Sequence, residues 1–161
     1  GEQDITFVDI DIDGYDFFVL QAILEKFKPF LISAEVNEKI PPPIKFTVKY
    51  SESYAWDGSH FYGMSISKFE ELAKNHDYDL VDLNVNNIYA IRKDKNRTGK
   101  SFSAKELYSK KYKTLRLKGE LDNIVPYNEN MDFLLNLEGD DLYEAVESFY
   151  KPYKGKYENS F

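Results

Sequence analysis

The chain has 161 residues and a formal net charge of −7, which suits one domain with a sizeable core. Its acidity disfavours nucleic acid as a partner, because such binding depends on neutralising phosphates with Lys and Arg. The lack of cysteine excludes disulfides, thiol catalysis and cysteine-based zinc sites. No apolar run is long enough to cross a membrane and no signal-peptide pattern opens the sequence, so we expect a cytoplasmic protein.

The chain begins with a strand, a helix and a second strand. Residues 5–12 are an apolar strand that ends at a turn containing Gly14. Residues 15–27 carry apolar side chains at helical spacing, and residues 29–37 are a second buried strand. This order within about 30 residues predicts a right-handed βαβ unit with two parallel strands.

The next segment is harder to assign. Residues 38–64 contain the run Pro41 to Pro43, which fits neither a helix interior nor a central strand, so we expect a long irregular loop. Its many aromatic side chains favour an ordered loop. Ser67 and Glu70 have the spacing of a capping box and predict that a helix begins there.

Two alternating segments follow that helix. Residues 78–85 and 88–92 flank Asn86-Asn87 and predict an antiparallel hairpin. With the preceding elements they complete an α/β domain over residues 1–93.

The rest of the chain is predicted to be mostly helical. The polar residues 94–102 form a linker, and residues 103–161 form a C-terminal extension. Ser103 and Glu106 predict a capping box at the first helix of the extension. A last helix is expected to end before Pro152, and the polar tail after it is expected to be frayed.

Acidic residues mark the carboxyl ends of both parallel strands. Asp9, Asp11 and Asp13 have the spacing that places side chains on one face of a strand, and Glu35 and Asn37 end the second strand. Ligands of open α/β sheets bind at such ends, so Asp11 and Asp13 are candidate catalytic residues and metal ligands. Two neighbouring acidic strand ends favour a shared divalent cation or a raised carboxyl pKa, with Glu35 and Asn37 as candidate substrate contacts. The alternative is that Asp13 caps the helix and Glu35 binds loop backbone.

A third candidate feature lies in the aromatic loop. Trp56, Asp57 and His60 stand close together in a segment that contains two glycines and is able to close over an acceptor substrate. His60 is a candidate base because its ordinary pKa lies near neutrality, and Trp56 and Asp57 are candidate substrate contacts. A single loop histidine is also commonly structural.

These segments, in this order, resemble the C-terminal half of class I S-adenosylmethionine-dependent methyltransferases of the FkbM-like group. The resemblance covers about residues 5–93. The segments that carry it are DIDIDGYD at 9–16, ISAEVN at 32–37, WDG at 56–58, YGMS at 62–65, YDLV at 78–81 and NNIYAIR at 86–92.

The resemblance implies a partial Rossmann-like sheet equivalent to strands 4-5-7-6 of the family, mixed, with an antiparallel last hairpin. It places Asp11 and Asp13 where the family's acidic turn faces the active centre, and it implies S-adenosylmethionine as cofactor and a small-molecule or sugar hydroxyl as acceptor. The family binds the donor with a glycine-rich turn after its first strand, and these 161 residues contain no such turn. We therefore assign no cofactor-binding residue and expect no donor binding by this chain alone.

The first strand also predicts a partner. In the family, the strand equivalent to residues 5–12 is paired on both sides, and an unpaired apolar edge is prone to association. We expect either that residues 103–161 cover this edge or that a homodimer buries it, and we predict the homodimer.

Other functions fit part of the pattern. Asp11 followed by Asp13 is also how a haloacid-dehalogenase-type magnesium phosphatase begins, with Asp140 and Asp141 as its late acidic motif, although Tyr15 stands where a threonine is expected. A sugar-nucleotide transferase with an Asp-x-Asp metal site is a further alternative. In a last alternative, the chain is a methyltransferase-like module that binds a partner or assembles without catalysis.

Overall fold

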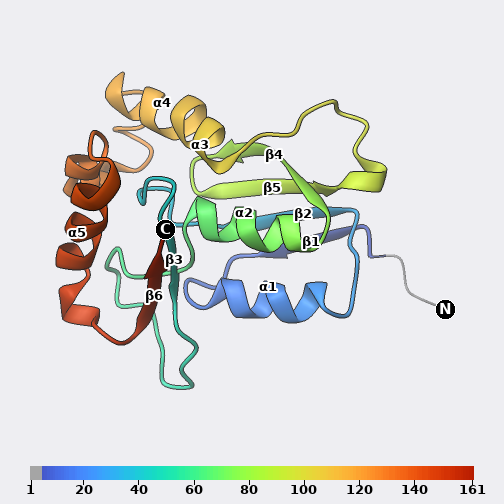
Figure 1. Cartoon of the computed structure of the whole chain (residues 1–161), viewed down its shortest axis with the longest axis horizontal. Helices are drawn as coiled ribbons and strands as arrows, with labels where there is room; N and C mark the ends of the chain where they lie inside the picture. Colours follow the sequence, from blue (N-terminus) through green and yellow to red (C-terminus); the bar gives the residue numbers. More distant parts are fainter. Residues whose placement is uncertain (1–4) are drawn as a thin grey trace.

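The computed structural model describes residues 5–161, which form an α/β structure around a mixed four-stranded sheet (Figure 1). The strands are β1 (Phe7–Ile10), β2 (Leu31–Glu35), β4 (Tyr78–Asn84) and β5 (Asn87–Arg92), in the order β1-β2-β5-β4. β1 and β2 are parallel, whereas β5 is antiparallel to both of its neighbours. The predicted α/β class, parallel pair and antiparallel hairpin are confirmed.

Two helices pack on this sheet. α1 (Asp16–Leu24) connects β1 to β2, and α2 (Ile66–Asn75) precedes β4. The ammonium of Lys68 in α2 lies 4.7 Å from the ring centroid of Phe17 in α1, so the two helices touch. No helix in residues 5–161 combines the length and the apolar character needed to cross a bilayer.

The C-terminal region is built of short helical segments. A first helix runs through α3 (Ala104–Leu107), the π-helical segment η2 (Tyr108–Lys113) and α4 (Thr114–Leu117). The 3-10 segment η3 (Pro126–Leu134) and helix α5 (Gly139–Phe149) follow, and the shorter turns are η1 (Lys93–Lys95) and η4 (Lys151–Tyr153). The capping box of Ser103 and Glu106 at the start of α3 is confirmed.

A second, two-stranded sheet corrects two predictions. β3 (Lys45–Val48) lies inside the segment expected to be irregular, and it pairs antiparallel with β6 (Tyr157–Ser160), inside the tail expected to be frayed. Each strand has only four residues, and the partners are more than 100 positions apart, so no local pattern signals the pairing. In Figure 1 this pair lies beside the main sheet, with α5 on its other side.

The helix cap at α2 was also assigned to the wrong serine. Ser65, not Ser67, is the N-cap, and its hydroxyl accepts a hydrogen bond from the backbone N–H of Lys68 at 3.2 Å. Glu70 instead accepts from the backbone N–H of Ala104 at 3.1 Å, which ties α2 to α3.

The buried apolar side chains form two clusters. The first lies between the main sheet, its two helices and the α3–η2 segment, and it includes Leu20, Ile32, Leu107 and Tyr112. The second is aromatic and joins β3 and β6 to α5: the ring of Phe46 stacks on Tyr150 at 4.6 Å and on Tyr157 at 5.3 Å between centroids. Residues 103–161 therefore contribute to both cores.

The second core predicts that the C-terminal strand is part of the stable fold. Replacing Tyr157 by Ala should lower the free energy of unfolding by about 3 kcal/mol, because it empties a buried aromatic site. Glu158→Ala, on the exposed face of the same strand, should change it by less than about 0.5 kcal/mol. Urea unfolding measures both, and equal effects of the two substitutions would show that β6 does not pack as described.

Candidate functional site

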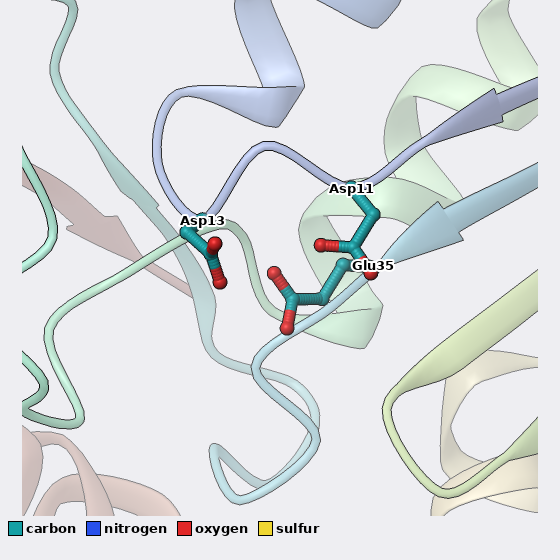
Figure 2. A group of neighbouring side chains, drawn as sticks. All are labelled: Asp11, Asp13 and Glu35. Atoms are coloured by element: carbon teal, nitrogen blue, oxygen red, sulfur yellow. The ribbon is translucent and has the colours of Figure 1, made fainter.

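The candidate site lies at the carboxyl ends of the two parallel strands. Asp11 directly follows β1, Asp13 lies in the turn before α1, and Glu35 is the last residue of β2. Each contributes one carboxylate oxygen to a group whose members all lie within 4.8 Å of one another, which we call the carboxylate cluster. Figure 2 shows the three side chains turned toward a common space. Asp9 is not part of this cluster, because β1 ends at Ile10 and the chain then leaves the strand geometry.

Local hydrogen bonds hold the turn that carries Asp11 and Asp13. The carboxylate of Asp16 accepts hydrogen bonds from the backbone N–H groups of Ile12 and Gly14, both at 3.0 Å. Asp13 adopts a positive φ of 52°, a conformation that Asp tolerates better than most residues. Asp16 thus organises the turn. Asp13, for which the alternative was a helix cap, is instead exposed in the carboxylate cluster, and the N-cap of α1 is Tyr15.

Gly14 is needed for a close approach. A Cβ atom at this position would come within 2.7 Å of Cε1 in the ring of Tyr54. The backbone C=O of Gly14 also accepts a hydrogen bond from the N–H of Gly63 at 2.8 Å. The aromatic loop is therefore packed directly onto the turn.

Glu35 is the buried member of the carboxylate cluster, with 6% of its surface exposed. Its Oε1 accepts a hydrogen bond from Asn86 Nδ2 at 2.8 Å, and its buried Oε2 has no hydrogen-bond partner within the described part of the chain. Burial, followed by repulsion from Asp11, Asp16 and Asp13, raises the pKa of Glu35 to about 8. The proposed alternative for Glu35, a bond to loop backbone, is not what the structure shows.

The pKa values of two neighbouring carboxyls are also raised. For Asp11 the first cause is burial, and the second is repulsion by Asp13 and then Asp9. For Asp16 burial outweighs the backbone hydrogen bonds that favour its ionised form. The carboxylate cluster is thus a region where negative charge is costly, which is typical of functional sites.

The other predicted site residues lie elsewhere. Asn37 does not face the carboxylate cluster: its Nδ2 donates to the carbonyl oxygens of His60 at 2.8 Å and Tyr62 at 3.3 Å. Trp56 is 45% exposed and donates to the carbonyl of Ser59 at 2.8 Å. Asn37 and Trp56 therefore hold the aromatic loop in place.

His60 and Asp57 also lie outside the carboxylate cluster. The half-buried ring of His60 stacks on Tyr127 at 5.3 Å, and its pKa is lowered by burial and by the charge of Lys39. Asp57 accepts a hydrogen bond from the hydroxyl of Tyr153 at 3.0 Å. Neither residue belongs to the group of Asp11, Asp13 and Glu35.

Asp57 instead lines a cleft of about 330 Å³ on the far side of Tyr54. Four rings form its walls, those of Tyr50, Tyr54, Phe61 and Tyr153, and we call it the aromatic cleft. Because Tyr54 both lines this space and has its ring close to Gly14, the cleft adjoins the turn that carries Asp13.

A buried ionic group next to the site was not anticipated. Glu38 and Lys39 follow β2 by three and four residues, and their side chains are fully buried, 3.5 Å apart between Oε2 and Nζ. Lys39 Nζ also donates to the hydroxyl of Tyr62 at 2.6 Å, and Asn128 Nδ2 donates to Glu38 Oε1 at 2.6 Å. The sequence signal is weak, because Glu-Lys pairs usually lie on the surface.

The chain was compared with known proteins in three ways. No protein-family model matches it, and neither the curated proteins nor the solved structures contain a match.

The burial of Glu35 predicts a pH-dependent stability. Its folded-state pKa of about 8 lies above its ordinary value of 4.5, so the folded protein holds a proton that the unfolded chain releases. This contribution to stability is complete below pH 4.5 and is lost as the pH rises toward 8. Glu35→Gln keeps the acceptor for Asn86 without the charge. At pH 8, in EDTA, it should raise the free energy of unfolding by about 1–2 kcal/mol, less than the whole pKa shift because water screens the open side of the cluster.

Urea unfolding at pH 4, 6 and 8 checks this expectation. The gain from Glu35→Gln should vanish at pH 4, where Glu35 is protonated in both states. Glu144→Gln, at an exposed carboxylate on α5, is the matched control and should be neutral throughout. A destabilised Glu35→Gln variant at pH 8 would contradict the description of this site.

Proposed function

We propose that this chain is the acceptor-side part of an S-adenosylmethionine-dependent O-methyltransferase. The observation that supports this most is the strand order β1-β2-β5-β4, in which an antiparallel hairpin places its second strand next to a parallel pair. This is the 4-5-7-6 arrangement that the resemblance implies. By the resemblance, the acidic residues at the ends of β1 and β2 would belong to the acceptor side of such a site.

The carboxylate cluster suits an acceptor that carries a hydroxyl group. An ionised carboxylate accepts a hydrogen bond from a hydroxyl, and it takes the proton as the oxygen becomes nucleophilic. The raised pKa of Asp11 makes it a stronger base than an ordinary aspartate, and its exposed side chain is accessible to a substrate. The adjoining aromatic cleft offers flat apolar walls for the rest of a small molecule or sugar.

The described residues do not fit the methyl donor. The donor would need a glycine-lined cradle after a parallel strand, and the one glycine turn after β1 is filled by a side chain. At Gly14 the ring of Tyr54 occupies the space that a Cβ would take. The proposal therefore assigns donor binding to residues outside these 161, and no step of the transfer is derived from this chain.

Calorimetry with S-adenosylmethionine tests the proposal. The 161-residue chain should give no binding heat up to millimolar donor, whereas a longer product of the natural reading frame should bind the donor and methylate a hydroxyl acceptor. Asp11→Asn in the longer protein should lower the rate by about 10²–10⁴-fold without weakening donor binding, as expected for loss of a base. Tight donor binding by the 161-residue chain, or a fully active Asp11→Asn variant, would overturn it.

The phosphatase alternative loses one of its two supports. Asp140 and Asp141 are exposed in the first turn of α5. Neither belongs to the carboxylate cluster, so the late acidic motif does not meet Asp11.

For the chain by itself we propose a second role, assembly into a homodimer through β1. Within residues 5–161, β1 pairs only with β2, and residues 103–161 add no strand to its other edge. Phe7 is 50% exposed and Ile12 is 46% exposed beside this edge. An apolar edge of this kind favours pairing with a second copy.

A proline tests this role without disturbing the sheet. Leu31 N–H donates to the carbonyl of Thr6, and because backbone direction alternates, the N–H of Asp9 points away from β2. Asp9→Pro removes that outward donor, which edge strands tolerate. Sedimentation equilibrium should show a dimer for the wild type and for the control Asp9→Asn, and a monomer for Asp9→Pro. A monomeric wild type at about 100 µM would end the proposal, since that is well above the Kd of a stable interface.

A further inference from the structure

The carboxylate cluster has the spacing of a cation site. Divalent cations bind oxygen ligands at about 2.0–2.6 Å, so two oxygens on one ion lie up to about 5 Å apart. The three oxygens from Asp11, Asp13 and Glu35 all fall within 4.8 Å of one another. Figure 2 shows the three carboxyl groups turned toward a common space, which is where one ion would lie.

A second observation is independent of this spacing. Glu35 is more than nine-tenths buried, and its Oε2 has no hydrogen-bond partner among the described residues. Figure 2 shows the carboxyl group of Glu35 turned to the side on which Asp11 and Asp13 lie. A buried carboxylate oxygen without a donor is costly, and native structures rarely leave one unsatisfied. The partner of Oε2 is therefore a group that residues 5–161 do not supply.

The protein's own cations do not fill this role. Across residues 5–161, no Lys, Arg or His forms an ion pair with Asp11, Asp13 or Glu35. Lys39 has a long-range attraction to Glu35, but its ammonium is bound by Glu38 and by the hydroxyl of Tyr62. The basic side chains of residues 5–161 therefore leave the carboxylate cluster without an ion-pair partner.

The donor set selects the kind of ion. Three carboxylates without imidazole or thiolate favour the hard cations Mg²⁺, Mn²⁺ and Ca²⁺ over zinc or copper. Asp11 and Asp13 are exposed, so water would complete the coordination shell on the open side. With three protein side chains and several waters, the affinity expected is in the range of about 10⁻⁴–10⁻³ M, as for other weak oxygen-ligand sites.

We propose that Asp11, Asp13 and Glu35 together bind one divalent, oxygen-preferring cation. The proposal goes beyond the methyltransferase function, because it needs neither a methyl donor nor an acceptor. Asn86 is the positioning residue: its bond to Oε1 turns Oε2 of Glu35 toward the ion. Asp16 positions the other two ligands by holding their turn.

Thermal unfolding with added cations tests the site on the chain itself. At 10 mM MgCl₂, MnCl₂ or CaCl₂, at least one cation should raise the Tm of the wild type by about 5 °C over its value in EDTA, the shift that a site of this affinity gives through mass action. Glu35→Gln and Asp11→Asn should respond by less than about 1 °C, whereas the control Glu144→Gln should respond like the wild type. Calorimetry with the effective cation should give one site per chain, and at least a tenfold weaker Kd in Glu35→Gln.

The test distinguishes loss of a ligand in Glu35→Gln from loss of the fold. A cooperative unfolding transition of Glu35→Gln in EDTA shows that the variant is folded, so a lost response to the cations then identifies a lost ligand. A wild type that neither binds nor responds to any of the three cations would overturn the proposal. So would a response that is the same in the wild type, Glu35→Gln and Asp11→Asn, since that would show binding elsewhere.

Discussion

The carboxylate of Asp16 is the interaction on which the site depends. By accepting two backbone hydrogen bonds, it closes the turn after β1 and holds Asp13 at its positive φ. The same turn is pinned to the aromatic loop by the bond from Gly63 to Gly14. Two carboxylates thus reach the end of β2 on a rigid support, and a small shift of this turn would separate them from Glu35. Asp16 is itself a buried acid beside Asp11, Asp13 and Glu35, and its burial is costly. We attribute its presence there to its role in holding the turn.

Glu35 lies at the end of β2 and completes the carboxylate cluster opposite Asp11 and Asp13. Its ionised form lowers the stability of the fold. Its negative charge is opposed by burial and by Asp11 and Asp13, while Asn86 is its one hydrogen-bond donor among the described residues. Asn86 itself sits in a hairpin turn next to Val85, whose φ of 56° is unfavourable for a β-branched residue. Local strain and an uncompensated buried acid at one point indicate a functional rather than a structural role. Either a proton or a bound cation neutralises the charge of Glu35. The unfolding experiments at different pH values and with added cations distinguish these two cases.

The sequence predicted what local periodicity and short connections control. The βαβ unit and the β4–β5 hairpin are of this kind, and so is the meeting of Asp11 with Glu35, which follows from two parallel strands ending at one edge. The pairing of β3 with β6 was missed because four-residue strands carry little pattern and their partners are distant in sequence. Asn37 was misplaced for a similar reason: besides loop carbonyls it donates to the hydroxyl of Tyr150, 113 positions away. Likewise, Glu38 and Lys39 are buried with hydrogen bonds to Asn128 and Tyr62. These partners are distant in sequence, so no local pattern predicts the burial.

The outer edge of β1 connects the proposals, because Asp11 follows that strand directly. A parallel strand added outside β1 would end beside Asp11 and bring further groups to the carboxylate cluster, as a donor-binding half requires. A second copy paired antiparallel would bring the beginning of its β1 to the same place, which covers the site without completing it. The two proposals for this edge therefore compete for one surface and give opposite results for access to Asp11. Cation binding by Asp11, Asp13 and Glu35 needs neither occupant, since all three ligands come from one chain.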